Sequence, residues 1–157
     1  MDSLAREKME NQASSITLEA SLENLKAVNS FICKWAKRAN LSPRSENNLL
    51  LAVEEVYVNI VKYAYPESLG KVTICCRMDK NSLISKIKDA GIPFNPLEVP
   101  EPRLVSRLEE RKEGGLGLFL MQKLVDNVGY EREGNYNVLT LVKSRKKKIK
   151  RRESKDN

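Results

Sequence analysis

Histidine is absent from all 157 residues of this chain. The absence excludes Ser-His-Asp and Cys-His nucleophiles, imidazole metal ligands and a phosphorylatable histidine within the chain. Any general base must therefore be a carboxylate, a lysine or a tyrosine.

Cysteine is also scarce, with three residues: Cys33, Cys75 and Cys76. No CxxC spacing occurs, which argues against a zinc site. Cys75 and Cys76 are adjacent and would point to opposite faces of a strand, so they are not expected to form a disulfide. We expect reduced thiols that pack as small apolar side chains in a cytosolic core.

Long hydrophobic runs are missing as well. No stretch approaches the roughly 20 apolar residues that a membrane-spanning helix needs. The first eight residues are charged and contain no apolar segment of the kind found in a secretory signal. We therefore expect no membrane span and a cytoplasmic location. The 41% hydrophobic content and the length of 157 residues fit one globular domain.

The net charge of +7 is confined to the C-terminal end. Residues 143–157 hold nine Lys or Arg and two Asp or Glu, whereas residues 1–142 hold 19 of each sign. Because a block of like charges repels itself, the sequence predicts a basic disordered tail at 144–157, after a flexible N-terminus at 1–11 and a domain at 12–143. The domain has no excess of positive charge of the kind that nucleic-acid-binding domains carry.

Hydrophobic periodicity and turn residues predict the elements of this domain. A long loop with four prolines is expected at 92–113, and a loop of that length is usually functional, often a lid. Strands are predicted at 12–19, 71–79, 82–89, 128–133 and 137–143, with helices beginning at Ser21, at Ser42-Pro43 and at Leu116. The order indicates an α+β fold: a two-layer α/β sandwich whose mixed, mostly antiparallel sheet has three helices on one face.

The helix that begins at Ser42-Pro43 carries two polar residues whose side chains suit metal binding and proton transfer. Glu55 and Asn59 are four residues apart and therefore share one helix face. The Asn59 side-chain oxygen suits Mg²⁺, and the Glu55 carboxylate can accept a proton from an attacking hydroxyl. Lys62 extends the same face as a candidate phosphate contact. A plain polar face on an amphipathic helix is the alternative explanation of the spacing.

Two glycine-containing segments are candidate ligand sites. Asp89-Ala90-Gly91 ends a strand, where a carboxylate can accept a hydrogen bond from an exocyclic amine and glycine lets a flat base approach. An ordinary turn is the alternative there. Gly114, Gly115, Leu116 and Gly117 precede a helix, whose N-terminal amides favour phosphate; a flexible hinge is the alternative.

Taken together, these motifs resemble the GHKL ATPase superfamily, most closely the anti-sigma factor serine kinases of the RsbW type. The similarity runs from about residue 12 to 143 and depends on Glu55-x-x-x-Asn59, Asp89-x-Gly91-x-Pro93-Phe94 and Gly114-Gly115-Leu116-Gly117-Leu118-Phe119 in this order. The resemblance implies the Bergerat, or histidine-kinase-like ATPase, fold. It also implies ATP and Mg²⁺ as cofactors, and a mobile lid at about residues 97–113.

The resemblance also implies a role for each matching residue. Glu55 would be the catalytic base and Asn59 the Mg²⁺ ligand. Asp89, with Gly91 nearby, would read the adenine amino group, and Thr140 would assist Asp89 through water. Gly115 and Gly117 would hold the phosphates, with Gly114 and Leu116 beside them. For the γ-phosphate, Lys62, Arg111 and Lys112 are candidates, and the lid residues Arg103 and Arg107 are alternatives.

The substrate implied by the resemblance is a serine or threonine on a small antagonist protein with a STAS domain. Such kinases can also sequester a sigma factor, and relatives often form dimers, although no interface can be identified from the sequence. The chain has Tyr63 where the anti-sigma members usually have histidine, and Asn95 where many relatives have aspartate. Neither departure touches Glu55, Asn59 or Asp89.

Two alternatives to a protein kinase are kept. One is a binding module that captures a regulator under the control of ATP or ADP without appreciable kinase activity. The other is the detached catalytic domain of a histidine kinase, which is disfavoured because the chain has no histidine and no dimerisation helix pair.

Overall fold

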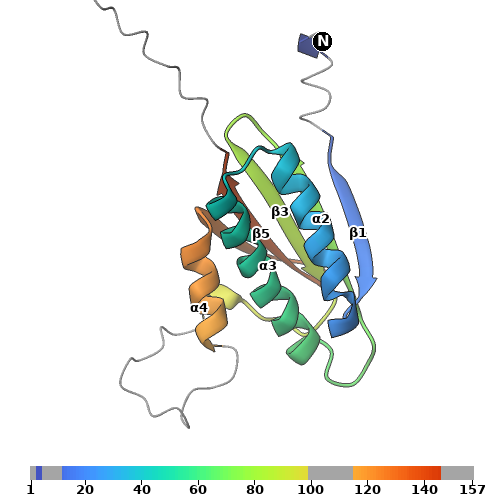
Figure 1. The fold of residues 1–157 in the computed structure, drawn as a ribbon. Coiled ribbons are helices and arrows are strands. Elements are labelled where there is room, and N and C mark those ends of the chain that lie inside the picture. Colours follow the sequence, from blue (N-terminus) through green and yellow to red (C-terminus); the bar gives the residue numbers. More distant parts are fainter. Residues whose placement is uncertain (1–2, 5–11, 99–114, 146–157) are drawn as a thin grey trace, which may run out of the picture.

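The protein is described from a computed structural model, which covers residues 3–4, 12–98 and 115–145. The described chain contains five strands and three α-helices, with a short 3₁₀ turn (η) at two places (Figure 1). In chain order they are β1 (Ser14–Glu19), η1 (Leu22–Asn24), α2 (Leu25–Arg38), α3 (Pro43–Tyr63), β2 (Lys71–Met78), β3 (Ser82–Asp89), η2 (Pro96–Glu98), α4 (Gly115–Leu124), β4 (Asn127–Glu133) and β5 (Tyr136–Ser144).

The five strands of the described ranges form one sheet in the order β1-β2-β3-β5-β4. The helices α2, α3 and α4 lie on one side of this sheet, and α3 packs between the other two (Figure 1). The predicted α+β fold with helices on one face is confirmed. Every strand pairing in the sheet is antiparallel, so the parallel component of the predicted mixed sheet does not occur in this part of the chain.

Helix α3, the longest described element, begins where the sequence predicts. The Ser42 side chain accepts a hydrogen bond from the Ser45 backbone N–H (3.1 Å), and Pro43 occupies the first helical position. This cap satisfies one of the amides that a helix N-terminus leaves without a partner, and proline has no amide to lose there. The helix ends at Tyr63, shortly before Pro66.

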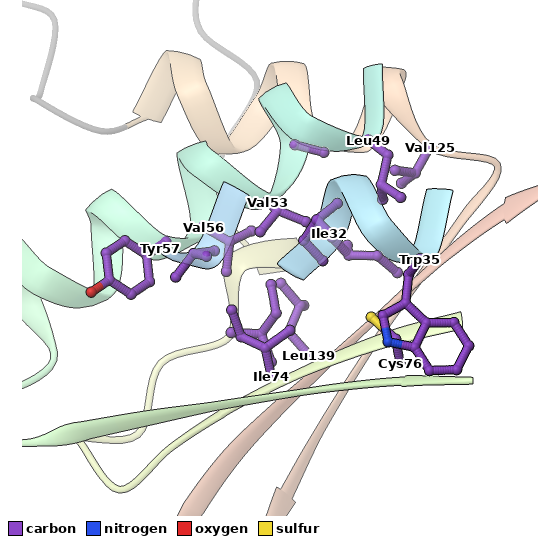
Figure 2. Close-up of a cluster of buried hydrophobic side chains, with 14 of the residues drawn as sticks. Ile32, Trp35, Leu49, Val53, Val56, Tyr57, Ile74, Cys76, Val125 and Leu139 are labelled. Atoms are coloured by element: carbon purple, nitrogen blue, oxygen red, sulfur yellow. The ribbon is translucent and has the colours of Figure 1, made fainter. Parts of the chain in front are cut away.

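The core fills the space between the helices and the sheet. Figure 2 shows Ile74 and Leu139 of the sheet beneath Ile32 and Val53 of the helices, all of them buried. Met121 brings α4 into the same cluster. Because α3 is held by core contacts on its sheet side, its polar positions have one defined orientation.

The prediction that the cysteines are buried in the core is correct for one of the three and wrong for the other two. Cys33, Cys75 and Cys76 are all free, but only Cys76 is buried, while the other two are half-buried. Burial raises the pKa of the Cys76 thiol to about 12, against a weaker lowering by its contact with the Ser85 hydroxyl. Cys76 is therefore an inert core side chain at physiological pH.

The described residues include two beyond the expected domain boundary at residue 143. Lys143 is buried and donates a hydrogen bond to the Leu124 carbonyl oxygen (2.9 Å). Arg145 donates to the carbonyl oxygens of Ala39 (3.2 Å), Asp79 and Asn81 (2.8 Å each). The remainder of the predicted basic tail, most of the predicted flexible N-terminus and residues 99–114 lie outside the described residues.

No helix among the described residues is both long enough and apolar enough to cross a membrane.

Candidate functional site

Glu55 and Asn59 lie on α3 as the sequence predicts. Their neighbours Val53, Val56 and Ile60 are buried, whereas Glu55 and Asn59 are half-buried at the side of the helix. Lys62, nearly one turn further on, is exposed. The three side chains thus follow one strip of α3 from its middle to its end.

The start of α4 lies directly against Glu55. A methyl group added to Gly117 would overlap the carboxylate of Glu55, and the three atoms nearest to that position all belong to the Glu55 side chain. Gly117 is therefore a place where a side chain would occupy the space that Glu55 uses. The structure brings together the Glu55-Asn59 helix and the glycine segment, two motifs that lie about 60 residues apart in the sequence.

The other members of the glycine segment are only partly described. Gly115 is the first residue of α4, and Leu116 in its first turn is 43% exposed. Gly114 and the candidate lid residues Arg103, Arg107, Arg111 and Lys112 lie outside the described residues, so their expected phosphate contacts stay predictions.

The second part of the site is a tight turn after β3. Asp89 is only 5% exposed, and its Oδ1 atom accepts a hydrogen bond from the Gly91 backbone N–H (2.9 Å). A Cβ at Gly91 would lie 2.5 Å from the Ala64 carbonyl oxygen and 2.8 Å from Asp89 Oδ1. Only glycine fits this space, so the turn is pressed against the end of α3.

Asn137 of β5 holds the same carboxylate. Its side-chain amide donates to Asp89 Oδ1 (3.0 Å) and to the Ile92 carbonyl oxygen (2.8 Å). Its Oδ1 accepts from the Tyr130 hydroxyl (2.6 Å) and the Phe94 backbone N–H (3.2 Å). Every polar atom of this buried amide is therefore satisfied.

Both donors at Asp89 reach Oδ1. Neither the Gly91 backbone N–H nor the Asn137 side-chain amide donates to the second carboxylate oxygen, Oδ2. Oδ2 is therefore the atom with which Asp89 can accept a hydrogen bond from a ligand, while Oδ1 fixes the orientation of the carboxylate.

The structure does not bring Thr140 to Asp89. Asp89 pairs with Asn137 across the β3–β5 ladder, and Thr140 pairs with Lys86. Side chains alternate along a strand, so Thr140 faces away from the core residues Leu139 and Leu141 and from the helices. Asn137 occupies the place beside Asp89 that the sequence analysis assigned to Thr140.

Sequence reasoning missed Asn137 for a physical reason. An asparagine two residues after a turn carries no motif, and its contact with Asp89 depends on how β5 pairs with β3. The available clue was the apolar alternation of Leu139 and Leu141, which places Asn137 on the helix-facing side and Thr140 on the other.

The donor set fits Mg²⁺ bound together with a nucleotide rather than a metal held by protein alone. No cluster of three or more Asp, Glu, Cys or His residues occurs in the ranges that the structure covers. Mg²⁺ commonly takes one or two protein oxygens and completes its shell with phosphates and water. The Asn59 amide oxygen on a half-exposed helix face suits that arrangement.

Comparisons with known proteins identify the class to which this fold and site belong. A family model described as a histidine kinase-like ATPase domain matches residues 18–143. The chain belongs to the histidine kinase-like ATPase family.

The similar proteins narrow this class to the RsbW-type branch of the GHKL superfamily, as the motif order predicts. The chain is 30% identical over 108 residues to the serine/threonine-protein kinase BtrW of Bordetella bronchiseptica, an alignment that covers 68% of this chain and 76% of BtrW. It is 27% identical over 113 residues to the serine-protein kinase RsbW of Bacillus mycoides, covering 66% of this chain and 68% of that protein.

A solved structure supports the fold. The crystal structure of the RsbU and RsbW domains of a Mycobacterium tuberculosis protein matches with a TM-score of 0.61 over 87% of this chain, at 16% identity. This chain spans 34% of that larger one. At such low identity the match concerns the arrangement of helices and strands alone.

Proposed function

We propose that this protein is an ATP-dependent serine/threonine kinase that phosphorylates a STAS-domain antagonist of an anti-sigma factor. The single observation that carries the proposal is the Asp89 turn. A nearly buried carboxylate is held by two hydrogen bonds at one oxygen and keeps its other oxygen for a ligand. This is a fixed acceptor suited to the amino group of adenine.

The α3 strip supplies the groups for the transfer. Mg²⁺, when bound, would neutralise charge on the phosphates. Asn59 would offer its amide oxygen to the metal, and α4 would present backbone amides near Gly117 to phosphate oxygens. Glu55 would accept the proton that a serine or threonine hydroxyl releases as its oxygen bonds to the γ-phosphorus and ADP leaves.

Protein kinase activity is the function that the relatives support, since both named relatives are serine or serine/threonine kinases. The direct test is incubation with γ-labelled ATP, Mg²⁺ and the purified STAS-domain proteins of the same organism. Label on a serine or threonine of one of them would support the proposal and identify the substrate. Labelling should disappear with Asp89→Asn, which weakens ATP binding.

Glu55→Gln separates the kinase from a nucleotide-gated binding module. The substitution keeps the size of the side chain and removes its basicity, so it should lower phosphotransfer by about 100-fold or more while ATP still binds. Wild-type protein that binds ATP and captures a STAS protein or a sigma factor, yet labels neither, would contradict the kinase and support the module.

Sequestration of a sigma factor is part of the same proposal. It predicts that the protein retains a sigma factor of its own organism in a pull-down and that the unphosphorylated STAS protein competes for this binding. If no sigma factor binds, the sequestration part of the proposal is wrong and phosphorylation alone remains.

A further inference from the structure

The side chain of Tyr65 links three segments around the candidate adenine site. Its hydroxyl accepts a hydrogen bond from the Ala90 backbone N–H (2.7 Å) and donates one to the Lys71 carbonyl oxygen (2.6 Å). Ala90 follows Asp89 directly, and Lys71 is the first residue of β2. The phenol of Tyr65, two residues past the end of α3, thus holds the start of β2 and the end of β3 together.

The ring of Tyr65 has little freedom to move away from this position. It packs against Gly70, where an added methyl group would overlap the ring. Burial raises the pKa of the Tyr65 phenol, so the hydroxyl keeps its proton and remains a donor to Lys71. Both hydrogen bonds of the hydroxyl can therefore persist across the physiological pH range.

The residue before Tyr65 holds the other side of the same turn. The Ala64 carbonyl oxygen accepts a hydrogen bond from the Ile92 backbone N–H (3.0 Å), and Gly91 is packed against Ala64. The end of α3 therefore contacts the turn on both flanks of Gly91. The same helix carries Asn59 little more than one turn earlier, so the distance between the Asp89 and Asn59 groups is set by these contacts.

We propose that Tyr65 is a positioning residue that fixes the Asp89 carboxylate relative to the Asn59 helix and thereby sets the preference for adenine over guanine. The inference depends on the proposed ATP site and deepens it. Adenine offers an exocyclic amine to a fixed carboxylate oxygen, whereas guanine offers a carbonyl oxygen at that position, which the carboxylate repels. Loosening the turn should therefore harm ATP more than GTP.

The test uses Tyr65→Phe, which keeps the ring and removes only the hydroxyl. Titration calorimetry with Mg²⁺ should show ATP binding weakened about fivefold, the effect expected for a lost hydrogen bond. GTP binding should change less, so the ratio of the two dissociation constants should fall. An unchanged ratio would overturn the proposal, because a merely structural role would weaken both nucleotides alike or neither.

Tyr57→Phe is the matched control, at a tyrosine of α3 whose hydroxyl makes similar backbone contacts. The Tyr57 hydroxyl also accepts a hydrogen bond from a backbone N–H, that of Ser21 (3.2 Å), and donates one to a backbone carbonyl oxygen, again that of Ser21 (2.6 Å). Ser21 follows β1 and lies outside the Asp89 turn. Its removal should lower thermal stability without changing the ATP to GTP ratio. A ratio altered as much by Tyr57→Phe as by Tyr65→Phe would overturn the assignment to Tyr65.

The wild-type protein gives a second measurement that needs no variant. If the Tyr65 contact and the nucleotide hold the same turn, saturating ATP should slow amide exchange at Ala90 and leave Ser21 unchanged. Equal exchange at Ala90 with and without bound ATP would contradict the inference. Wild-type protein that binds no adenine nucleotide, or Asp89→Asn that binds ATP normally, would refute the proposed function itself.

Discussion

Gly117 determines how much room the Glu55 carboxylate has. The contact is between one glycine of α4 and the end of a flexible side chain, so an added methyl group would displace the carboxylate rather than break the fold. The contact between Gly117 and Glu55 therefore joins the candidate general base to the segment that is expected to bind phosphate.

Gly117→Ala should therefore separate stability from activity. Alanine is a better helix former than glycine by about 1 kcal/mol, so the unfolding free energy should not fall. Displacement of Glu55 should reduce phosphotransfer by roughly 100-fold. Urea unfolding and the labelling assay measure the two effects. Gly129→Ala is the control, because nothing lies within 4 Å of its added methyl group; equal losses in both variants would contradict the account.

Asn137 is a second residue whose role comes from its contacts. Asn137→Ala removes the donor to Asp89 and leaves the Tyr130 hydroxyl and the Ile92 carbonyl oxygen without their partner. The unfolding free energy should drop by about 1–3 kcal/mol and ATP binding should weaken.

Thr140→Ala provides the comparison for Asn137→Ala. Thr140 lies on the opposite face of β5, so calorimetry should give an unchanged ATP affinity for this variant. Weaker ATP binding by Thr140→Ala than by Asn137→Ala would restore the role that the sequence suggested for Thr140.

Among the elements, α3 has the greatest influence on the site. It carries Glu55 and Asn59, buries its other face against the sheet, and ends directly before the residues that contact the Asp89 turn. Its N-terminal cap at Ser42 lies three turns or more from Glu55. The cap should therefore affect the stability of the helix without altering the geometry of the site.

Ser42→Ala should lower the unfolding free energy by about 1 kcal/mol through loss of the cap. Chemical denaturation would measure this loss as a lower midpoint, while the slope of the free energy against denaturant concentration stays unchanged. ATP affinity at a temperature where the variant is folded should equal that of the wild type. A large loss of affinity in the folded variant would mean that the start of α3 also sets the site.

For the molecule as a whole, the thiol and phenol groups that are buried make the folding stability depend on pH at alkaline values. The pKa of Cys76 is raised from its ordinary value of 9.0 to about 12, so the unfolded chain releases this proton first as pH rises. The stabilisation is fully present below pH 9 and is lost as pH rises toward 12. Burial raises the pKa of Tyr57 and Tyr65 as well, which acts in the same direction.

Cys76→Ala should flatten this dependence. Between pH 9 and 11 the unfolding free energy of the wild type should fall more steeply, by up to about 1.4 kcal/mol per pH unit relative to the variant. Urea unfolding at a series of pH values measures the difference between the two slopes. Parallel curves for the two proteins would show that the Cys76 thiol does not carry the effect.

Local features of the site were predictable because neighbours in the chain produce them. The Ser42 cap, the shared helix face of Glu55 and Asn59, and the Asp89–Gly91 turn all depend on backbone geometry within four residues. The helix and strand periods likewise place each apolar residue without reference to the rest of the fold. The order of these motifs was also enough to indicate the family.

The long-range contacts depend on how separate elements meet. Strand pairing selects Asn137 rather than Thr140 to hold Asp89, and helix packing brings Gly117 to Glu55. Tyr65 reaches Ala90 only because α3 ends beside the turn after β3. A shift of one residue in register would exchange the faces of β5, and no local preference of the chain prevents it. Burial of the common core decides the register, and with it the partners of Asp89 and Glu55.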